Sequence, residues 1–161
     1  DRMPVNRFTI VAKVNLAGAG TFGLAEKNDE NRRDGFDFAI VDGKPGLIVE
    51  RAEQNVFAQT ATAAVRTGEW AQVAVTWEPA IGNDTGIRLF VNGVEVARGS
   101  TQVGRGALNY TSSTSFPFRI GAGTLFTTQG LNGRMAYLAV YTGRHLTPAE
   151  LVQLDARLPI R

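Results

Sequence analysis

Oxygen-bearing side chains gather in two polar segments of the chain, residues 26–35 and 78–86. Carboxylate and amide oxygens are the ligands that calcium prefers in proteins. Calcium is therefore the metal ion that these segments favour, and the candidate ligands are Asn28, Asp29, Asp34, Asn83 and Asp84. Their spacing is not that of an EF-hand loop. Asp and Asn in loops commonly only form turns, so a structural role for these residues stays open.

Transition-metal and serine-hydrolase chemistry have little support. The chain has one histidine, His145, and no cysteine. Zinc sites need three or four protein ligands, most often Cys and His, so His145 is expected to be a surface turn residue instead of a metal ligand. No Gly-x-Ser-x-Gly segment occurs, so a nucleophilic serine of the Ser-His-Asp type is not predicted.

Two aromatic residues in polar segments, Tyr110 and Phe126, are the best candidates for stacking on a sugar ring. Each could instead fold inward as a cover for the core. With Asn109 and Arg105 they form the set of candidate ligand-binding residues. Trp70 and Trp77 lie at the two ends of an apolar segment and are expected to be buried.

Charge and hydropathy exclude several classes of partner. The chain has 17 Lys and Arg residues against 15 Asp and Glu, a net charge of +2, and its arginines are scattered along the sequence. A nucleic-acid-binding domain would concentrate them on one element or face, so no nucleic-acid partner is predicted. The apolar runs are far shorter than a membrane-spanning helix needs, so no membrane insertion is predicted either.

Short apolar segments with alternating polarity recur along the chain and are typical of half-buried strands. Residues 7–16 show this alternation most clearly, with a Gly-rich interruption before a second strand at residues 21–25. Residues 26–35 have no periodicity and are predicted to form a surface loop. The further predicted strands are residues 36–41, 47–51, 54–65, 70–77, 87–92, 94–98, 118–121 and 134–141. In the last of these, Met135, Tyr137, Ala139 and Tyr141 are expected to share one face.

Turn and cap signals divide these elements. Asp42-Gly43 and Asn92-Gly93 are dipeptides that favour tight hairpin turns, because both residues tolerate positive φ. The one convincing helix is at the end of the chain, where Thr147 caps it, Pro148 occupies its first position and Glu150 completes a capping box. Leu151, Leu154 and Leu158 would form its apolar stripe. About a dozen short strands and one helix predict a two-sheet antiparallel β-sandwich.

The order of several short motifs resembles the laminin-G-like, concanavalin-A-like jelly-roll family. Any one of them alone would be weak, but six in the family's order and spacing are fairly specific. They are spread over most of the 161-residue chain and are Phe8–Ile10, Gly68–Trp77, Leu89–Gly93, Arg119–Gly121, Leu131–Arg134 and Val140–Leu151. The resemblance implies a single all-β jelly-roll domain over residues 1–161 with one short C-terminal helix. It also implies that calcium, where present, lies at the rim of the sandwich.

The resemblance also raises the question of catalysis, because the same clan contains retaining β-glucanases. Those enzymes carry their two catalytic carboxylates on one Glu-x-Asp-x-(x)-Glu strand, and retaining hydrolysis places the two groups about 5 Å apart. No Glu-x-Asp spacing occurs in this chain. The sequence therefore predicts a protein that is not an enzyme, with glycoside chemistry kept as a minor alternative.

Two functional hypotheses follow from the resemblance and the missing motif. The first is a non-catalytic extracellular binding module that recognises carbohydrate or protein through loops at its rim. The second is a structural or adhesive building block of a cell-surface assembly, whose partners are neighbouring subunits or other domains of a longer chain. The family usually has a strand some twenty residues before its first motif, and here six residues precede Arg7. We therefore expect a sheet edge that is exposed or completed by another chain, in a processed or excised product secreted by a bacterium.

Overall fold

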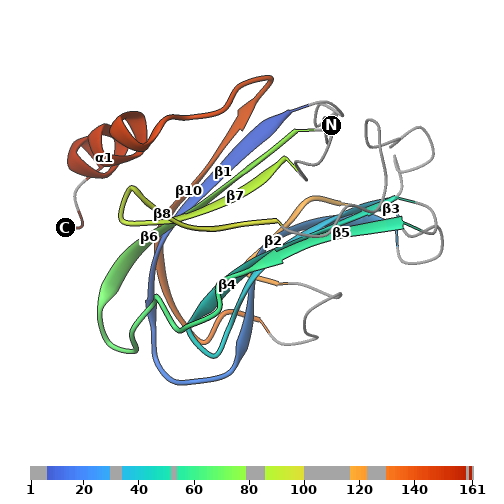
Figure 1. Ribbon diagram of the computed structural model, residues 1–161. Helices are drawn as coiled ribbons and strands as arrows, with labels where there is room; N and C mark the ends of the chain where they lie inside the picture. The colour runs from blue at the N-terminus through green and yellow to red at the C-terminus, as the bar shows by residue number, and fades with distance from the viewer. Residues whose placement is uncertain are drawn as a thin grey trace.

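The computed structural model describes residues 7–29, 34–51, 54–78, 86–99, 117–122, 130–158 and 160. These residues form ten strands and one helix, arranged as two stacked sheets with the helix beside one of them (Figure 1). All pairs of neighbouring strands are antiparallel. The predicted fold, a two-sheet jelly-roll sandwich with one short C-terminal helix, is therefore confirmed.

Each sheet has five strands. The first sheet has the order β10 (Gly133–Thr142), β1 (Phe8–Leu16), β6 (Trp70–Trp77), β7 (Ile87–Val91) and β8 (Val94–Arg98). The second has the order β5 (Gln54–Gln59), β4 (Lys44–Arg51), β3 (Asp34–Val41), β2 (Thr21–Asp29) and β9 (Arg119–Ile120). Strands that are adjacent in the first sheet can be far apart in sequence, because β1 pairs with β6 on one side and β10 on the other.

The core fills the space between the sheets and is rich in aromatic rings. Phe8 of the first sheet lies against Phe36 of the second, with ring centroids 5.0 Å apart, and against Trp77 at 5.5 Å. Alternate residues of each inner strand join this cluster, as the sequence alternation predicts. Trp77 is buried as expected.

Both predicted hairpin turns have the backbone that their sequences favour. Asp42 and Gly43 have φ values of 48° and 74°, and Asn92 and Gly93 have 50° and 77°. Two consecutive residues with positive φ are the mark of a type I′ turn, whose twist matches that of the strands it joins. These turns fix the register of β3 with β4 and of β7 with β8.

Three local predictions are wrong in their details. Strand β2 continues to Asp29 and β3 begins at Asp34, so most of the predicted polar loop is strand. Strand β5 ends at Gln59 and does not extend to residue 65. A bulge at Ala136, opposite the step from Lys13 to Val14, turns Met135 toward the core while Tyr137 stays on the other face.

Helix α1 (Pro148–Arg157) packs on the face of the first sheet that points away from the second. Leu146 and Leu151 bury their side chains there against Val11, Ala74 and Phe90. Leu154 is half-buried and Leu158 is exposed, so the predicted apolar stripe contributes mainly through its first leucine. Within the described residues, no helix is long and apolar enough to cross a membrane.

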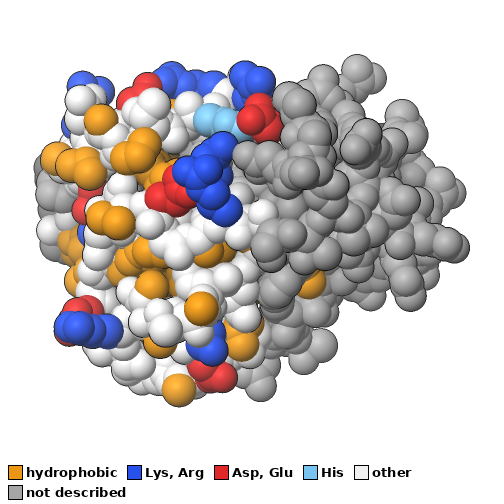
Figure 2. Space-filling view, in the orientation of Figure 1, with side chains coloured by type: hydrophobic (Ala, Val, Ile, Leu, Met, Phe, Trp, Pro, Cys, Tyr) orange, Lys and Arg blue, Asp and Glu red, His pale blue; other side chains and the backbone are white. Residues whose placement is uncertain are grey.

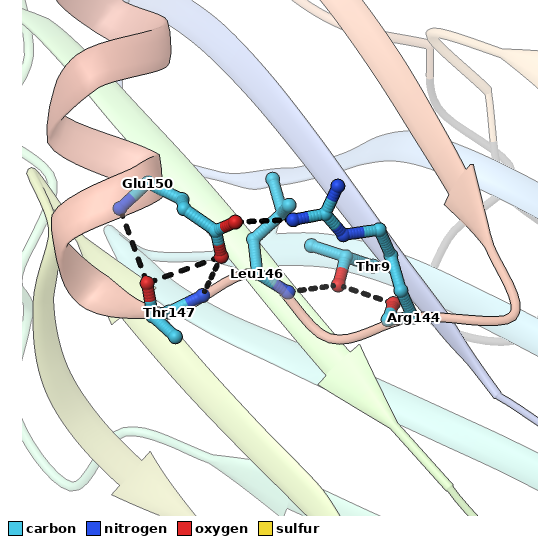
Figure 3. Close-up of polar contacts among 5 residues, drawn as sticks. All are labelled: Thr9, Arg144, Leu146, Thr147 and Glu150. Carbon is cyan, nitrogen blue, oxygen red and sulfur yellow. Dashed lines mark hydrogen bonds and ion pairs between the residues drawn. The ribbon is translucent and has the colours of Figure 1, made fainter.

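The start of α1 is held by a local network of hydrogen bonds (Figure 3). The predicted capping box is present: the Glu150 backbone N–H donates to Thr147 Oγ1 at 3.3 Å, and the Thr147 backbone N–H donates to Glu150 Oε2 at 2.8 Å. This bond from the Thr147 backbone lowers the pKa of Glu150. Thr9 of β1 fixes the preceding turn, because its Oγ1 donates to the Arg144 carbonyl and accepts from the Leu146 backbone N–H, both at 3.0 Å.

The anchoring of α1 gives a direct stability test. Leu151→Ala removes a fully buried side chain at the interface between helix and sheet, so it should lower the free energy of unfolding by about 2–5 kcal/mol. The neighbouring Val152 is 53% exposed, and Val152→Ala is the matched control, with an expected change within about 0.5 kcal/mol. Urea unfolding measures both. Equal effects of the two variants would show that the helix is not docked as described.

Candidate functional site

The strand register lines up one position from each strand of the second sheet in a single row. The row consists of Arg119, Glu26, Asp37, Ile48 and Phe57, from β9 to β5. Phe36 and Phe38, on either side of Asp37, belong to the core. Because side chains alternate along a strand, Asp37 and Glu26 lie on the opposite face, called here the outer face of the second sheet.

Two carboxylates and a guanidinium lie together on this outer face. Glu26 is 1% exposed and Asp37 is 0% exposed, although they are directly opposite each other on β2 and β3. Arg119 Nη1 lies 2.5 Å from Glu26 Oε1, and its side chain is 37% exposed. Neither carboxylate is without a polar partner. Buried charges require such pairing, so Arg119 compensates the charge of Glu26 and is the accessible member of that ion pair.

Asn28 lies two positions after Glu26 and therefore on the same outer face. Its side chain is 2% exposed, and neither Nδ2 nor Oδ1 has a hydrogen-bond partner in the protein. A buried polar group left in this state costs about 1–3 kcal/mol. The residue opposite is Gly35, with a φ of 149°, where a Cβ would lie 2.2 Å from the Lys27 carbonyl oxygen. The outer face therefore combines charged groups with an unsatisfied amide beside a position that accepts only glycine.

Lys27 lies between Glu26 and Asn28 and is opposite Phe36, on the core side of β2. Its side chain is buried, and this burial lowers the pKa of its ammonium group. Lys27 is not without an interaction partner. The charged and polar residues of β2 are thus divided between the two faces of one strand.

The structure places only part of the predicted calcium set. Asn28 lies within β2, whereas Asp29 and Asp34 are register partners at the adjoining ends of β2 and β3, so these three positions come together at one end of a strand pair. Asn83 and Asp84 lie outside the described residues. In the part of the chain that the structure describes, no three acidic or histidine side chains form a group that could hold a metal ion. Calcium binding stays a prediction.

The predicted ligand-binding set, Tyr110, Phe126, Asn109 and Arg105, also lies outside the described residues and stays a prediction. The residues that sequence reasoning missed are Glu26, Asp37 and Arg119. The alternation of residues 36–41 already indicated that Asp37 faces away from the core. No sequence signal gave the register that brings Glu26 opposite Asp37 or the pairing of β9 with β2.

A second polar region lies beside α1 on the first sheet. It is a pocket of about 320 Å³ lined by Lys13, Trp70, Gln72, Asn92, Val152 and Asp155. Trp70 is only half-buried, which corrects the expectation that it is buried, and the Arg134 guanidinium lies 5.4 Å from the centre of its ring. On the face of the molecule shown in Figure 2, basic and acidic side chains of the described residues lie in mixed groups between apolar ones.

The polar groups of this pocket bond mainly to one another. Lys13 Nζ donates to Asp155 Oδ2 at 2.7 Å, and the Tyr137 hydroxyl donates to Asp155 Oδ1 at 3.2 Å. Gln72 Nε2 donates to the Tyr137 hydroxyl at 3.0 Å and to the Leu151 carbonyl at 2.9 Å. These bonds join α1 to β1, β6 and β10, so the pocket holds the helix in place.

His145 is half-buried in the turn before α1, with its Nε2 3.0 Å from the Trp77 carbonyl oxygen. Its Nδ1 lies 3.9 Å from Glu78 Oε1. The turn position agrees with expectation, although the ring contacts the end of β6 more closely than a fully exposed residue would.

The pocket network predicts a loss of stability at high pH. Burial raises the pKa of Tyr137 to about 12, above its ordinary value of 10.0. The folded protein therefore holds the phenol proton more tightly than the unfolded chain, so this stabilisation is complete below pH 10 and is lost as the pH rises toward 12. Tyr137→Phe should flatten the fall in stability over that range, as measured by urea unfolding at several pH values. An unchanged pH profile would contradict the burial of this hydroxyl.

Comparison with known proteins identifies the family. The family model of the concanavalin A-like lectin/glucanases superfamily matches residues 1–152. The chain belongs to this superfamily. A search of curated proteins finds no match.

Three solved structures show the same fold at low sequence identity. CBM40 of the Ruminococcus gnavus IT-sialidase, bound to α2,3-sialyllactose, is 20% identical with a TM-score of 0.68, over 93% of this chain and 83% of that one. Domain 4 of the arabinanase AbnA from Geobacillus stearothermophilus, in complex with arabinotriose, is 19% identical with a TM-score of 0.59, over 93% and 66%. The LG4–5 domains of the mouse laminin α1 chain are 10% identical with a TM-score of 0.65, over 87% and 38%.

Proposed function

We propose that this domain is a non-catalytic extracellular module that binds carbohydrate on the outer face of its second sheet. The observation that carries the proposal is the row of Arg119, Glu26 and Asp37, which places charged groups on a sheet face where they have no role in the core. Two neighbours of the same fold have carbohydrate bound, sialyllactose in one and arabinotriose in the other. A protein ligand on the same face is the second form of this proposal.

Arg119 is the group of the row that a ligand reaches, because it is the exposed member of its ion pair. A guanidinium has five N–H donors in a fixed plane, and one of its nitrogens contacts Glu26. Glu26 holds the guanidinium in place through this ion pair. We also propose that residues outside the row add contacts to the ligand, namely Tyr110, Phe126, Asn109 and Arg105. Calcium binding is proposed as well, with Asn28, Asp29, Asp34, Asn83 and Asp84 as the candidate ligands.

The paired carboxylates need a separate argument, since Glu26 and Asp37 face each other on neighbouring strands. Directly opposite residues have Cβ atoms about 4.5–5.5 Å apart, so their carboxyl groups can reach the separation of about 5 Å that a retaining glycosidase needs. A catalytic pair must reach the substrate, however, and these two side chains are 1% and 0% exposed. Glu26 is also held by Arg119. We therefore propose that the pair supports the binding surface and does not hydrolyse what is bound.

Screening on a glycan array, with calcium and then with chelator, tests the proposal directly. For a glycan that binds, Arg119→Gln should weaken the affinity at least tenfold, because the accessible donor is lost. Arg66→Gln, at a side chain that is 81% exposed and lies outside the row, should not change it. Calorimetry measures both affinities, and thermal melting checks that both variants are folded. If no glycan binds with calcium or with chelator, the carbohydrate proposal is wrong. Release of sugar from the bound glycan would show that the domain is an enzyme.

A second candidate function, a building block of a surface assembly, is favoured by the free edge of the first sheet. Among the described strands, β10 pairs only with β1, and it presents ten residues at this edge. Met135, Leu138 and Val140 pack against the core from β10 but are only half-buried. An unpaired edge of this length, whose single charged residue is Arg134 near its start, is a template for another strand. In contrast, the β8 edge carries Glu95 between Arg88 and Arg98.

Light scattering coupled to size-exclusion chromatography tests this second function. If β10 pairs with another copy, the mass of the wild type should rise with concentration, and Ala136→Lys should reduce association because an edge lysine opposes strand pairing. Val94→Lys on the β8 edge is the control and should have no effect. A wild type that stays monomeric at the highest concentration would leave the binding module as the only candidate.

A further inference from the structure

The chain has two Asn-Gly dipeptides, Asn92-Gly93 and Asn132-Gly133. Asparagine is among the chemically labile residues of proteins. A glycine after it hinders attack on the asparagine side chain least, because glycine has no Cβ. Both dipeptides have the same local chemistry, so a difference in their reactivity has to come from the fold.

We propose that Asn132 is a site of spontaneous deamidation, whereas the fold protects Asn92. The Gly133 backbone nitrogen loses its proton and bonds to Asn132 Cγ, while the bond from Cγ to Nδ2 breaks and the amide leaves as ammonia. Water then opens the five-membered succinimide at either carbonyl, which leaves aspartate or isoaspartate at position 132. The reaction consumes only water, and no electrons are transferred.

The side chain that reacts is accessible. Asn132 and Gly133 are both exposed at the start of β10. Among the described residues, no hydrogen bond holds the Asn132 side-chain amide. The amide is therefore able to turn toward the backbone nitrogen of the next residue without breaking an interaction.

The nitrogen that attacks is not used by the sheet. The Ala17 backbone N–H donates to the Asn132 carbonyl at 3.0 Å, so this pair of residues is hydrogen-bonded. Hydrogen-bonded and non-hydrogen-bonded pairs alternate along antiparallel strands, so the next pair, Leu16 with Gly133, is not bonded. The Leu16 carbonyl agrees with this pattern, because it accepts from the Gly68 N–H on its other side at 2.9 Å. The Gly133 N–H therefore points to the edge of β10, where no described strand lies.

The packing of β1 requires glycine after Asn132. Gly133 has a φ of 152°, and a Cβ there would lie 2.2 Å from the Asn15 carbonyl oxygen and 3.0 Å from Leu16 Cα. Any larger residue would clash with the backbone of β1. The fold thus keeps the one neighbour that makes an exposed asparagine most reactive.

Asn92 is held in a different way. Its Oδ1 accepts from the Gln72 backbone N–H at 2.9 Å, and its own backbone N–H donates to the Gln72 carbonyl at 2.8 Å. Gly93 is buried, with Val152 beside it. Attack requires the Asn92 side chain to leave Gln72 first, and opening one such hydrogen bond slows a reaction about fivefold.

The product changes the edge of the first sheet. Either aspartate or isoaspartate places a negative charge at the start of β10, and charges on an edge strand oppose pairing with another strand. Isoaspartate also makes the backbone between Leu131 and Gly133 one carbon longer, at the point where Ala17 holds β10 to β1. Deamidation should therefore loosen the start of β10 and lower the Tm.

Peptide mapping of the folded wild type after storage in mildly alkaline buffer tests the proposal. Trypsin places the two asparagines in separate peptides, residues 89–98 and 120–134. Mass spectrometry follows the exchange of NH₂ for OH in each peptide, and an isoaspartyl methyltransferase detects isoaspartate. Asn132 should react at least fivefold faster than Asn92. In urea, where Asn92 has lost its bond to Gln72, the two rates should approach each other.

Asn132→Gln is the matched variant, because glutamine keeps the exposed amide but would have to close a less favourable six-membered ring. It should form no isoaspartate in the peptide of residues 120–134, and its Tm should stay constant on storage while that of the wild type falls. Equal rates in the folded protein, a faster reaction at Asn92, an equally large difference in urea, or an equal loss of Tm in both proteins would overturn the proposal. None of these outcomes depends on what the domain binds.

Discussion

The contact between Phe8 and Phe36 is the interaction on which the arrangement of the two sheets depends. Phe8 begins β1 and Phe36 lies in β3, so their rings, with centroids 5.0 Å apart, join the first sheet to the second. Trp77 and Phe118 extend the same aromatic group along the sandwich. Once Phe36 points inward, alternation along β3 directs Asp37 outward. The core packing thus determines which residues of the second sheet lie on its outer face.

Elements with a local cause could be predicted from the sequence. Asn92-Gly93 and Asp42-Gly43 adopt the positive φ values that their hairpins require, and Thr147 with Glu150 forms the predicted capping box. These signals depend on a few consecutive residues and on backbone preferences that tertiary contacts do not change. The prediction for the end of β2 was wrong, because the charged residues there suggested a loop. The partner that lets Glu26 remain in a strand is Arg119, 93 residues further along the chain.

The candidate site depends almost entirely on such distant pairing. A motif search looks for carboxylates on one strand, and this chain brings Glu26 and Asp37 together from two strands joined across the polar segment after β2. A slip of one residue between β2 and β3 would turn one of the two to the core side. The register that prevents this slip comes from Phe36, Phe38 and Ile40 in the core, whose burial no single motif records. Fold and site therefore have one physical origin, although only the fold is visible in the sequence pattern.

The outer face also shows where this protein has not been optimised for stability. A buried pair of carboxylates requires a compensating arginine, and replacing such groups by apolar residues is often neutral or stabilising. The unsatisfied amide of Asn28 adds a further cost beside them. The outer face of the first sheet solves the same problem differently, because Val11, Ala74 and Phe90 are covered by Leu146 and Leu151 around helix α1. Apolar residues under a helix stabilise one sheet, whereas polar residues at a cost in stability occupy the other.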